Sequence, residues 1–184
     1  MSGAAPAEVS LHAGDFHFSG DPSRVRTVLG TCIAITIWHP VRHIGGMCLF
    51  LLPRRGTSDA IAGARAGLYA EEVFGLFSSS LEATQTRPSE YVAKVFGGGN
   101  MFPEYLQSAA CRKQECTDAM REECPTIGCQ NISAAKRLLS ANNYTLTSQD
   151  VGGHGSRYVV FETGNGDVWV RRGVAMSGID KVQS

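Results

Sequence analysis

The sequence predicts an α+β fold, in which mixed and antiparallel β-sheets are packed by helices within a single domain over residues 1–184. Segments rich in β-branched and aromatic residues recur along the chain and are separated by turn residues. Residues 62–77 instead carry apolar side chains near helical spacing. Strands and helices do not alternate strictly, so α+β is favoured over a parallel α/β sheet. The length of 184 residues is enough for one sizeable core.

The first half of the chain predicts a strand followed by a β-hairpin. Residues 24–29 alternate between polar and apolar side chains, as a half-buried strand does. Residues 32–38 are β-branched and aromatic and predict the next strand. We expect a turn at residues 39–42, because Pro40 cannot continue a β-ladder. The apolar run at residues 43–52 completes the hairpin.

The register of this hairpin decides which side chain faces Cys32. The expected turn pairs Trp38 with His43. Farther along the same ladder, Cys32 then lies opposite Leu49, with Cβ atoms about 5 Å apart. Cys48 lies on the other face, and a slip of one residue would exchange the two faces.

The second half predicts further strands and helices. The glycine-rich stretches predict tight turns between them. The expected elements are a helix over 62–77, a strand over 91–96, helical structure within 104–123, a helix over 131–141 capped by residues 131–133, a short strand over 144–147, a tight loop over 150–155, and a hairpin of strands 157–162 and 167–172.

Composition narrows the class of protein. The 17 Lys and Arg residues balance 17 Asp and Glu residues, so the charge gives no reason to expect nucleic-acid binding. No apolar run approaches the roughly 18 residues of a membrane span, so we expect no membrane insertion. The first residues lack the basic and apolar regions of a signal peptide. We therefore expect a cytoplasmic protein whose six cysteines are thiols, nucleophiles or ligands rather than disulfides.

Cys32 is the candidate nucleophile. It follows Gly30 and Thr31 at the point where one strand ends and another begins. Glycine allows close backbone approach, and the amides of such a turn can stabilise an oxyanion. A cysteine nucleophile normally needs a nearby base, whereas Leu49 carries no exchangeable proton. The alternative is that Cys32 only fills a small site in the core.

Five segments, in order along the chain, match the motifs of one known family. The chain reads TVLGTCIAI at 27–35, GGMCLFLLP at 45–53, AKVFGGGNMF at 93–102, NIS at 131–133, and DVGG at 150–153 before Arg157 and the closing hairpin. Similar family segments read TLLGSCVAV, GGMNHFMLP, AKIFGGANMF and NIG. Each match is weak alone, but all five in order are specific and cover nearly the whole chain. On these residues the chain resembles the chemoreceptor glutamine deamidase family, CheD.

The resemblance implies a cysteine-dependent amidohydrolase that converts receptor glutamines to glutamates. It places the nucleophile at Cys32 and a supporting threonine at Thr27. The implied partner is the helical cytoplasmic region of a chemoreceptor, and the reaction needs no cofactor. The expected substrate-binding residues are Gly30, Thr31, Gly98 and Asn100.

The family's histidine is replaced by Leu49. Loss of a general base typically costs about 10²–10⁴ in rate, so we expect a weak or inactive deamidase unless another group substitutes. His154, in the glycine loop, is the first substitute to consider. The remaining histidines either lie at the far end of the hairpin or have no position that the sequence defines: His39, His43, His12 and His17. The alternative function is a non-catalytic module that docks a CheC-type phosphatase or chemoreceptors.

The Cys-rich segment, residues 103–130, holds four of the six cysteines: Cys111, Cys116, Cys124 and Cys129. The resemblance implies an insertion, because the family usually joins the flanking motifs by a short loop. Four cysteines in a short segment can hold zinc or an iron–sulfur cluster. Paired C-x-x-C motifs are absent, however, and a spacing of five places two residues on different faces of a helix. Disulfides and free thiols therefore stay open beside a metal site.

Overall fold

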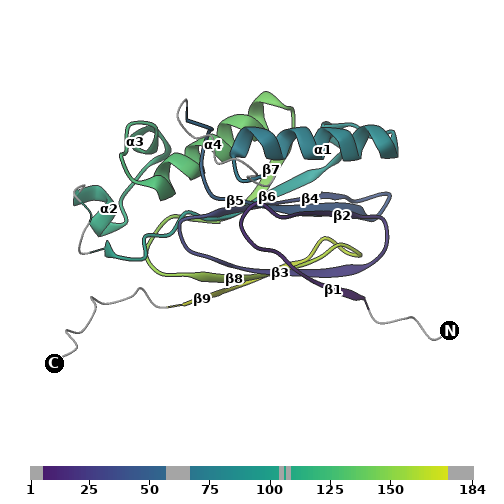
Figure 1. Cartoon of the computed structure of the whole chain (residues 1–184), viewed down its shortest axis with the longest axis horizontal. Helices are drawn as coiled ribbons and strands as arrows, with labels where there is room; N and C mark the ends of the chain where they lie inside the picture. The colour runs from purple at the N-terminus through teal and green to yellow at the C-terminus, as the bar shows by residue number, and fades with distance from the viewer. Residues whose placement is uncertain (1–5, 57–66, 104–105, 107–108, 174–184) are drawn as a thin grey trace.

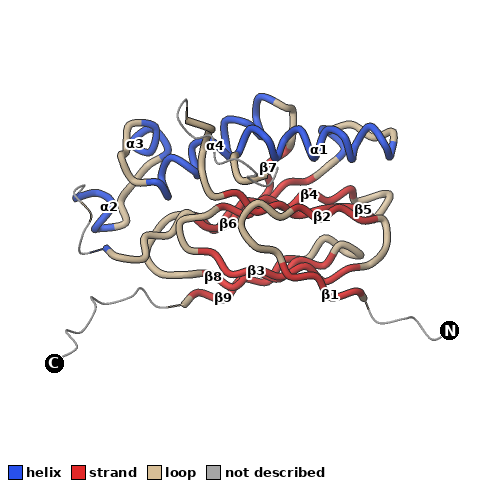
Figure 2. The backbone as a smooth tube through the Cα atoms, viewed as in Figure 1, coloured by secondary structure: helices blue, strands red, loops and turns tan. Residues whose placement is uncertain are grey.

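Two β-sheets and a layer of helices are stacked on one another in the computed structural model, which confirms the α+β prediction (Figure 1). The structure describes residues 6–56, 67–103, 106 and 109–173. The helices cover one face of the five-stranded sheet, and the four-stranded sheet packs against its other face (Figure 2). No helix in these ranges is long and apolar enough to cross a membrane.

The five-stranded sheet has the order β2-β5-β4-β6-β7. Neighbouring strands are antiparallel except β6 and β7, which are parallel. The strands are β2 (Phe16–Ser19), β4 (Ile33–His39), β5 (Ile44–Phe50), β6 (Val92–Gly97) and β7 (Thr145–Val151). In the central strand, Ile33 and Ile35 belong to the core under the helices, and Ala34 belongs to the core between the sheets. Because both faces are covered, β4 reads as an almost continuous apolar run.

The four-stranded sheet has the order β1-β3-β8-β9. Its strands are β1 (Ala7–Ser10), β3 (Ser23–Leu29), β8 (Arg157–Glu162) and β9 (Val168–Arg172). β3 alternates as predicted: Val25 and Leu29 are buried between the sheets, whereas Arg24 and Arg26 are exposed. The predicted hairpin of the last two strands is also confirmed. This sheet therefore has one buried face and one face in solvent.

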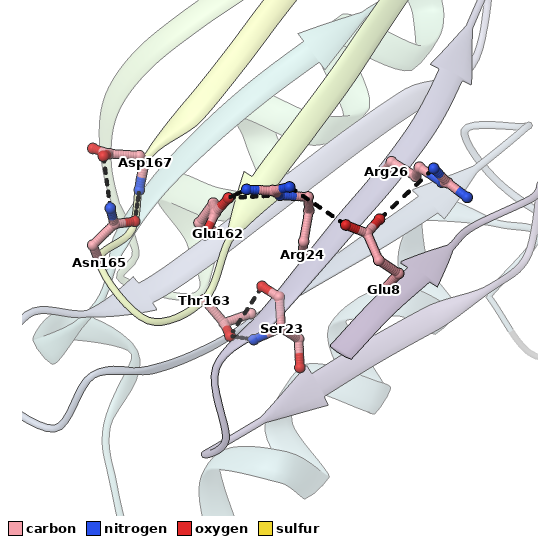
Figure 3. Close-up of polar contacts among 8 residues, drawn as sticks. All are labelled: Glu8, Ser23, Arg24, Arg26, Glu162, Thr163, Asn165 and Asp167. Carbon is pink, nitrogen blue, oxygen red and sulfur yellow. Dashed lines mark hydrogen bonds and ion pairs between the residues drawn. The ribbon is translucent and has the colours of Figure 1, made fainter. Parts of the chain in front are cut away.

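Charged side chains form a ladder across the solvent face of the four-stranded sheet (Figure 3). The guanidinium of Arg24 contacts Glu162 at 2.6 Å and Glu8 at 3.5 Å, and Arg26 contacts Glu8 at 3.7 Å. Exposed ion pairs of this kind contribute about 0.2–1 kcal/mol each. They keep the sheet's outer face polar, while the buried face supplies most of the stabilisation.

The helical layer consists of two long helices over the sheet and two short helices at one end. α1 (Ala70–Thr84) and α4 (Ile127–Ala141) bury Phe77 and Ile132 against the five-stranded sheet. The short helices are α2 (Ala109–Lys113) and α3 (Asp118–Glu122), and a 3₁₀ turn spans Pro88–Glu90. The predicted helical structure within 104–123 is thus two short helices rather than one long helix.

The first helix differs from the helix predicted at 62–77. Residues 62–66 lie outside the described residues, and the helix extends to Thr84 through three consecutive serines. The hydroxyls of these serines donate to carbonyls four residues earlier, a bond that serine makes inside a helix, and the buried apolar side chains continue to Leu81. The serines are Ser78, Ser79 and Ser80.

The helix predicted at 131–141 begins earlier, at Ile127. Asn131 is therefore inside the helix and is not its cap. Its side-chain amide is fully buried and donates to the carbonyl oxygens of Thr31 at 3.0 Å and Leu51 at 2.8 Å. A buried amide needs such partners, and here they join α4 to the two loops that leave the sheet.

The predicted hairpin register is wrong by two residues. His39 completes β4 and pairs with Ile44, so the turn occupies residues 40–43 and Leu49 faces Ala34 instead of Cys32. The imidazole Nδ1 of His39 accepts the main-chain amides of residues 41 and 42 at 3.3 Å. This capping shifts the turn, a local interaction that Pro40 alone does not reveal. Cys48 does lie on the opposite face of β5 from Leu49, as expected.

A buried ion pair joins β7 to β8. The Nε of Arg157, which is 2% exposed, donates to Asp150 at 3.0 Å, and Arg172 contacts the same carboxylate at 2.7 Å. Burial alone would raise the pKa of Asp150, but the hydrogen bonds from Arg172 and Arg157 outweigh it and hold that pKa below its usual value. The pair therefore stabilises the folded protein above the ordinary carboxylate pKa, and this stabilisation is lost as the pH falls through the lowered pKa.

We expect the Asp150→Asn substitution to lower the free energy of unfolding at pH 7 by about 3 kcal/mol, because it leaves the buried guanidinium of Arg157 without its carboxylate. The variant should also lose less stability than the wild type on acidification below about pH 4. Urea denaturation at both pH values measures these differences. Asp167→Asn, at an exposed carboxylate, is the matched control and should change stability by about 0.5 kcal/mol or less. Equal stability of Asp150→Asn and the wild type at pH 7 would contradict this role of the pair.

Candidate active site

Cys32 lies in a pocket of about 400 Å³ whose walls come from both sheets. The thiol is half-buried, and it follows β3 in the short connection to β4. The residues of this pocket that bear on chemistry are His12, Arg26, Thr27, Cys32, Leu49 and Tyr158. The structure thus brings together the predicted nucleophile, the predicted threonine and the leucine that replaces the histidine.

The turn that carries Cys32 is held by the backbone of the glycine run, which consists of Gly97 at the end of β6 and the two residues that follow, Gly98 and Gly99. The amide of Gly98 donates to the carbonyl of Cys32 at 2.8 Å, and the amide of Gly99 donates to that of Gly30 at 2.9 Å. Gly97 has a φ of +111°, and a Cβ there would collide with the carbonyl oxygen of Cys32. Only glycine allows this approach. The backbone of the glycine run therefore fixes the position of the turn.

Two predicted substrate-binding residues lie in this support and do not line the pocket. Gly98 packs against Ile132 of α4. Asn100 is 7% exposed, and its main chain is paired with Gly153 and Gly155. Gly30 and Thr31 form the turn itself, as the sequence predicts, with Gly30 closely packed on a methionine side chain.

Thr27 connects the pocket to the loop after β1. Its side chain is buried, and its hydroxyl donates to the carbonyl of Leu11 at 2.9 Å. The amide of Leu11 in turn donates to the carbonyl of Arg26 at 2.9 Å. Because these bonds fix both sides of Leu11, they fix the position at which the next residue, His12, meets the pocket.

Leu49 makes the wall beside Cys32 apolar. Its side chain is 2% exposed, and its own backbone is bonded to Gly14 and Asp15 of the loop after β1. Burial raises the pKa of the Cys32 thiol above its ordinary value, against a smaller lowering effect from the residue's own backbone. Without a base, the thiol therefore holds its proton at neutral pH.

His12 is the pocket residue that sequence reasoning missed. Its imidazole Nδ1 lies 3.4 Å from the carboxylate of Asp15, and its main-chain amide donates to the same carboxylate at 2.8 Å. The side chain is 80% exposed, at the mouth of the pocket. No motif marks it, since the pocket that it shares with Cys32 is lined by residues far apart in the sequence. A His three residues before an Asp is the single local signal that the sequence offers.

His154, the substitute base considered first, lies elsewhere. Its Nε2 is 3.1 Å from the carbonyl oxygen of Cys111, and its Nδ1 is 3.2 Å from the side-chain amide of Gln114. Both ring nitrogens are thus engaged by the Cys-rich segment, and His154 does not line the Cys32 pocket. The main-chain pairing of residues 152–155 with the glycine run turns this loop away from the thiol.

The remaining histidines and Cys48 are also outside this pocket. His39 and His43 lie at the hairpin turn, and His17 is paired with Met47 in the five-stranded sheet. Cys48 lies in the core under the helices, where burial raises the pKa of its thiol to about 12. None of these groups can exchange a proton with Cys32 in this arrangement.

Three cysteines of the Cys-rich segment, for which a metal site, disulfides and free thiols were all left open, lie together at a second position. The sulfur atoms of Cys111, Cys124 and Cys129 all lie within 4.8 Å of one another. This cluster is a separate core from the one that contains Cys32.

Comparison with known proteins identifies the family. Residues 51–172 match the family model described as CheD chemotactic sensory transduction. A relative from Dechloromonas aromatica (strain RCB), named a probable chemoreceptor glutamine deamidase CheD 3, is 38% identical over 170 residues, which cover 91% of this chain and 90% of the relative. A probable chemoreceptor glutamine deamidase CheD from Pseudomonas syringae pv. syringae (strain B728a) is 38% identical over 90% of this chain and 84% of its own. A more distant one, from Leptospira interrogans, is 33% identical over 90% of this chain and 92% of its own. The chain therefore belongs to the CheD family.

Proposed function

We propose that this chain is a chemoreceptor glutamine deamidase in which Cys32 is the nucleophile and His12 has taken the place of the missing base. The observation that carries the proposal is the single pocket lined by Cys32, Thr27 and His12 in a member of the CheD family. The names of the relatives support the reaction, and the pocket supports the assignment of residues.

The reaction begins with transfer of the Cys32 thiol proton to the imidazole of His12. The sulfur then attacks the carboxamide carbon of a glutamine side chain, and main-chain amides of the Cys32 turn stabilise the oxyanion. The C–N bond breaks, and ammonia leaves with the proton that the imidazole returns. Water hydrolyses the thioester to give glutamate and the free thiol. In total, glutamine and water give glutamate and ammonia.

The contact between His12 and Asp15 suits the imidazole to this role. A carboxylate beside Nδ1 orients the ring and stabilises the imidazolium that forms, which leaves Nε2 for the proton from sulfur. Base catalysis needs that nitrogen within direct reach of the thiol or one water away. An exposed histidine is positioned less firmly than a buried one. We therefore expect slow turnover.

The substrate is a glutamine on the helical cytoplasmic region of a chemoreceptor, and this places the protein in the cytoplasm. The open pocket admits a side chain from a protein surface, with Arg26 and Tyr158 at its edge. No cofactor takes part in this chemistry.

A second function follows if His12 fails as a base. The wall at Leu49 is apolar and the pKa of Cys32 is raised, both of which favour a protein that binds without reacting. Such a module would keep the family's binding face and dock chemoreceptors or a CheC-type phosphatase.

The first prediction concerns turnover. We expect mass spectrometry of a receptor cytoplasmic fragment incubated with the full chain to show a gain of about 1 Da at defined glutamines, which Cys32→Ala abolishes. His12→Gln should lower the rate on the order of 10²-fold or more. His43→Gln, at the distant hairpin turn, is the matched control and should leave the rate unchanged. If the wild type binds the fragment without modifying it, the binding function is favoured. Full activity in His12→Gln would exclude His12 as the base.

The second prediction restores the family's residue. Leu49→His places an imidazole in the wall beside Cys32, and we expect deamidation to rise about 10-fold or more over the wild type. Leu49→Met keeps an apolar side chain of similar volume and should have no such effect. A folded Leu49→His variant with wild-type activity would show that the pocket no longer accepts the ancestral arrangement.

The third prediction follows from burial of the thiol. Because burial raises the pKa of Cys32, its alkylation rate by iodoacetamide should still be rising at pH values above the ordinary thiol pKa of about 8.5. Quantification of the modified peptide across pH measures this. Cys48, buried in the core, serves as the internal control and should stay unmodified in the folded protein. A plateau reached below pH 7 would mean that a neighbouring charge stabilises the thiolate.

A further inference from the structure

The sulfur of Cys111 lies at the centre of the Cys-rich segment. It is 3.1 Å from the sulfur of Cys116, 3.2 Å from that of Cys124 and 3.8 Å from that of Cys129. The four thiols come from α2, the loop after it, the loop before α4 and the first turn of α4. Four successive parts of residues 111–129 thus bring three sulfur atoms close to that of Cys111.

This arrangement fits one shared ion better than disulfides. A disulfide holds its two sulfurs about 2.05 Å apart and uses each sulfur once. Here one sulfur is close to three others, and each of these distances is far longer than a disulfide bond. A tetrahedral ion with metal–sulfur bonds of about 2.3 Å holds its ligand atoms about 3.8 Å apart. A four-iron cluster needs wider spacing, because each cysteine binds a different iron atom.

The burial of these thiols supports a bound metal ion. Cys111, Cys124 and Cys129 are 1%, 8% and 4% exposed, and they form a small core of their own beside Leu106. Three or four thiols offer little apolar surface compared with the aliphatic and aromatic cores elsewhere in the protein. A small, loop-rich unit with so little apolar surface usually depends on a metal or on disulfides.

The surrounding helices also need such an anchor. α2 and α3 have five residues each, far below the length at which a helix is stable alone. α2 ends at Lys113, and Gln114 then adopts a left-handed φ of 62°. This reversal brings Cys116 back to Cys111, so the spacing of five residues does not separate the pair.

We propose that Cys111, Cys116, Cys124 and Cys129 bind one zinc ion as four thiolates. The four thiols release four protons on binding, and no electron transfer is involved. The ion would fix α2 and the loops around it to the first turn of α4.

The site would also support the Cys32 turn. Cys129 lies two residues before Asn131, whose amide holds the carbonyl of Thr31. On the other side, the carbonyl of Cys111 contacts His154, which pairs with Asn100 at the end of the glycine run. Loss of the ion should therefore loosen both supports of the turn, whether or not the protein is a deamidase.

Metal analysis of the full chain, purified anaerobically, tests the proposal. We expect one zinc per chain that survives a wash with a chelator. Cys111→Ser and Cys116→Ser should lose zinc to the same wash, whereas Cys48→Ser, at a buried thiol outside the cluster, should keep it. Cys116 is the least buried of the four, so its variant is the one expected to fold without the complete ligand set.

Cobalt substitution of the wild-type protein supplies a test that does not depend on any variant. A tetrahedral tetrathiolate site should give strong visible bands and a sulfur-to-cobalt charge-transfer band. Iron in place of zinc, disulfides detected as a loss of two hydrogens per bond, or a metal-free chain that gives no cobalt bands would each overturn the proposal.

Discussion

The close contact between the glycine run after β6 and the turn that carries Cys32 is the constraint on which the candidate site depends. Gly97 can approach the carbonyl of Cys32 only because it lacks a Cβ and adopts a φ of +111°. Two hydrogen bonds from Gly98 and Gly99 then hold the turn. The position of the thiol is thus set by backbone atoms, which explains why the glycines matter although they do not contact the pocket.

Other elements reinforce this contact from outside. Arg157, buried against Asp150, fills the space beside Gly99 and joins the ends of β7 and β8. Asn131 reaches from α4 to the carbonyl of Thr31. The cluster of Cys111, Cys124 and Cys129 lies at the start of that same helix. The Asn131 side chain and the main chain of Gly98 and Gly99 therefore join the short loop of Cys32 to α4 and to the end of β6.

The presence of Leu49 where the family has histidine changes which residue can act as the base for Cys32. With Leu49 in its wall, the thiol has an apolar neighbour and a raised pKa. His12 enters from a different strand connection and carries its own carboxylate partner. In the proposed mechanism the base is an exposed imidazole, so access to solvent, rather than packing, limits how well it is oriented.

The sequence by itself determined the α+β class, the main strands and the closing hairpin, because β-branched runs, alternation and turn residues are local signals. The family motifs likewise identified Cys32, Thr27 and the loss of histidine at Leu49. Local signals were insufficient at two places: burial of Phe77 and Leu81 extends α1 through the serines, and the His39 imidazole bonds to the hairpin turn. Only the tertiary structure decided that His12 lines the same pocket as Cys32, that His154 is bonded to the Cys-rich segment instead, and that the sulfurs of three other cysteines lie around that of Cys111. These contacts depend on how loops and strands are arranged in space, and no periodicity along the sequence encodes them.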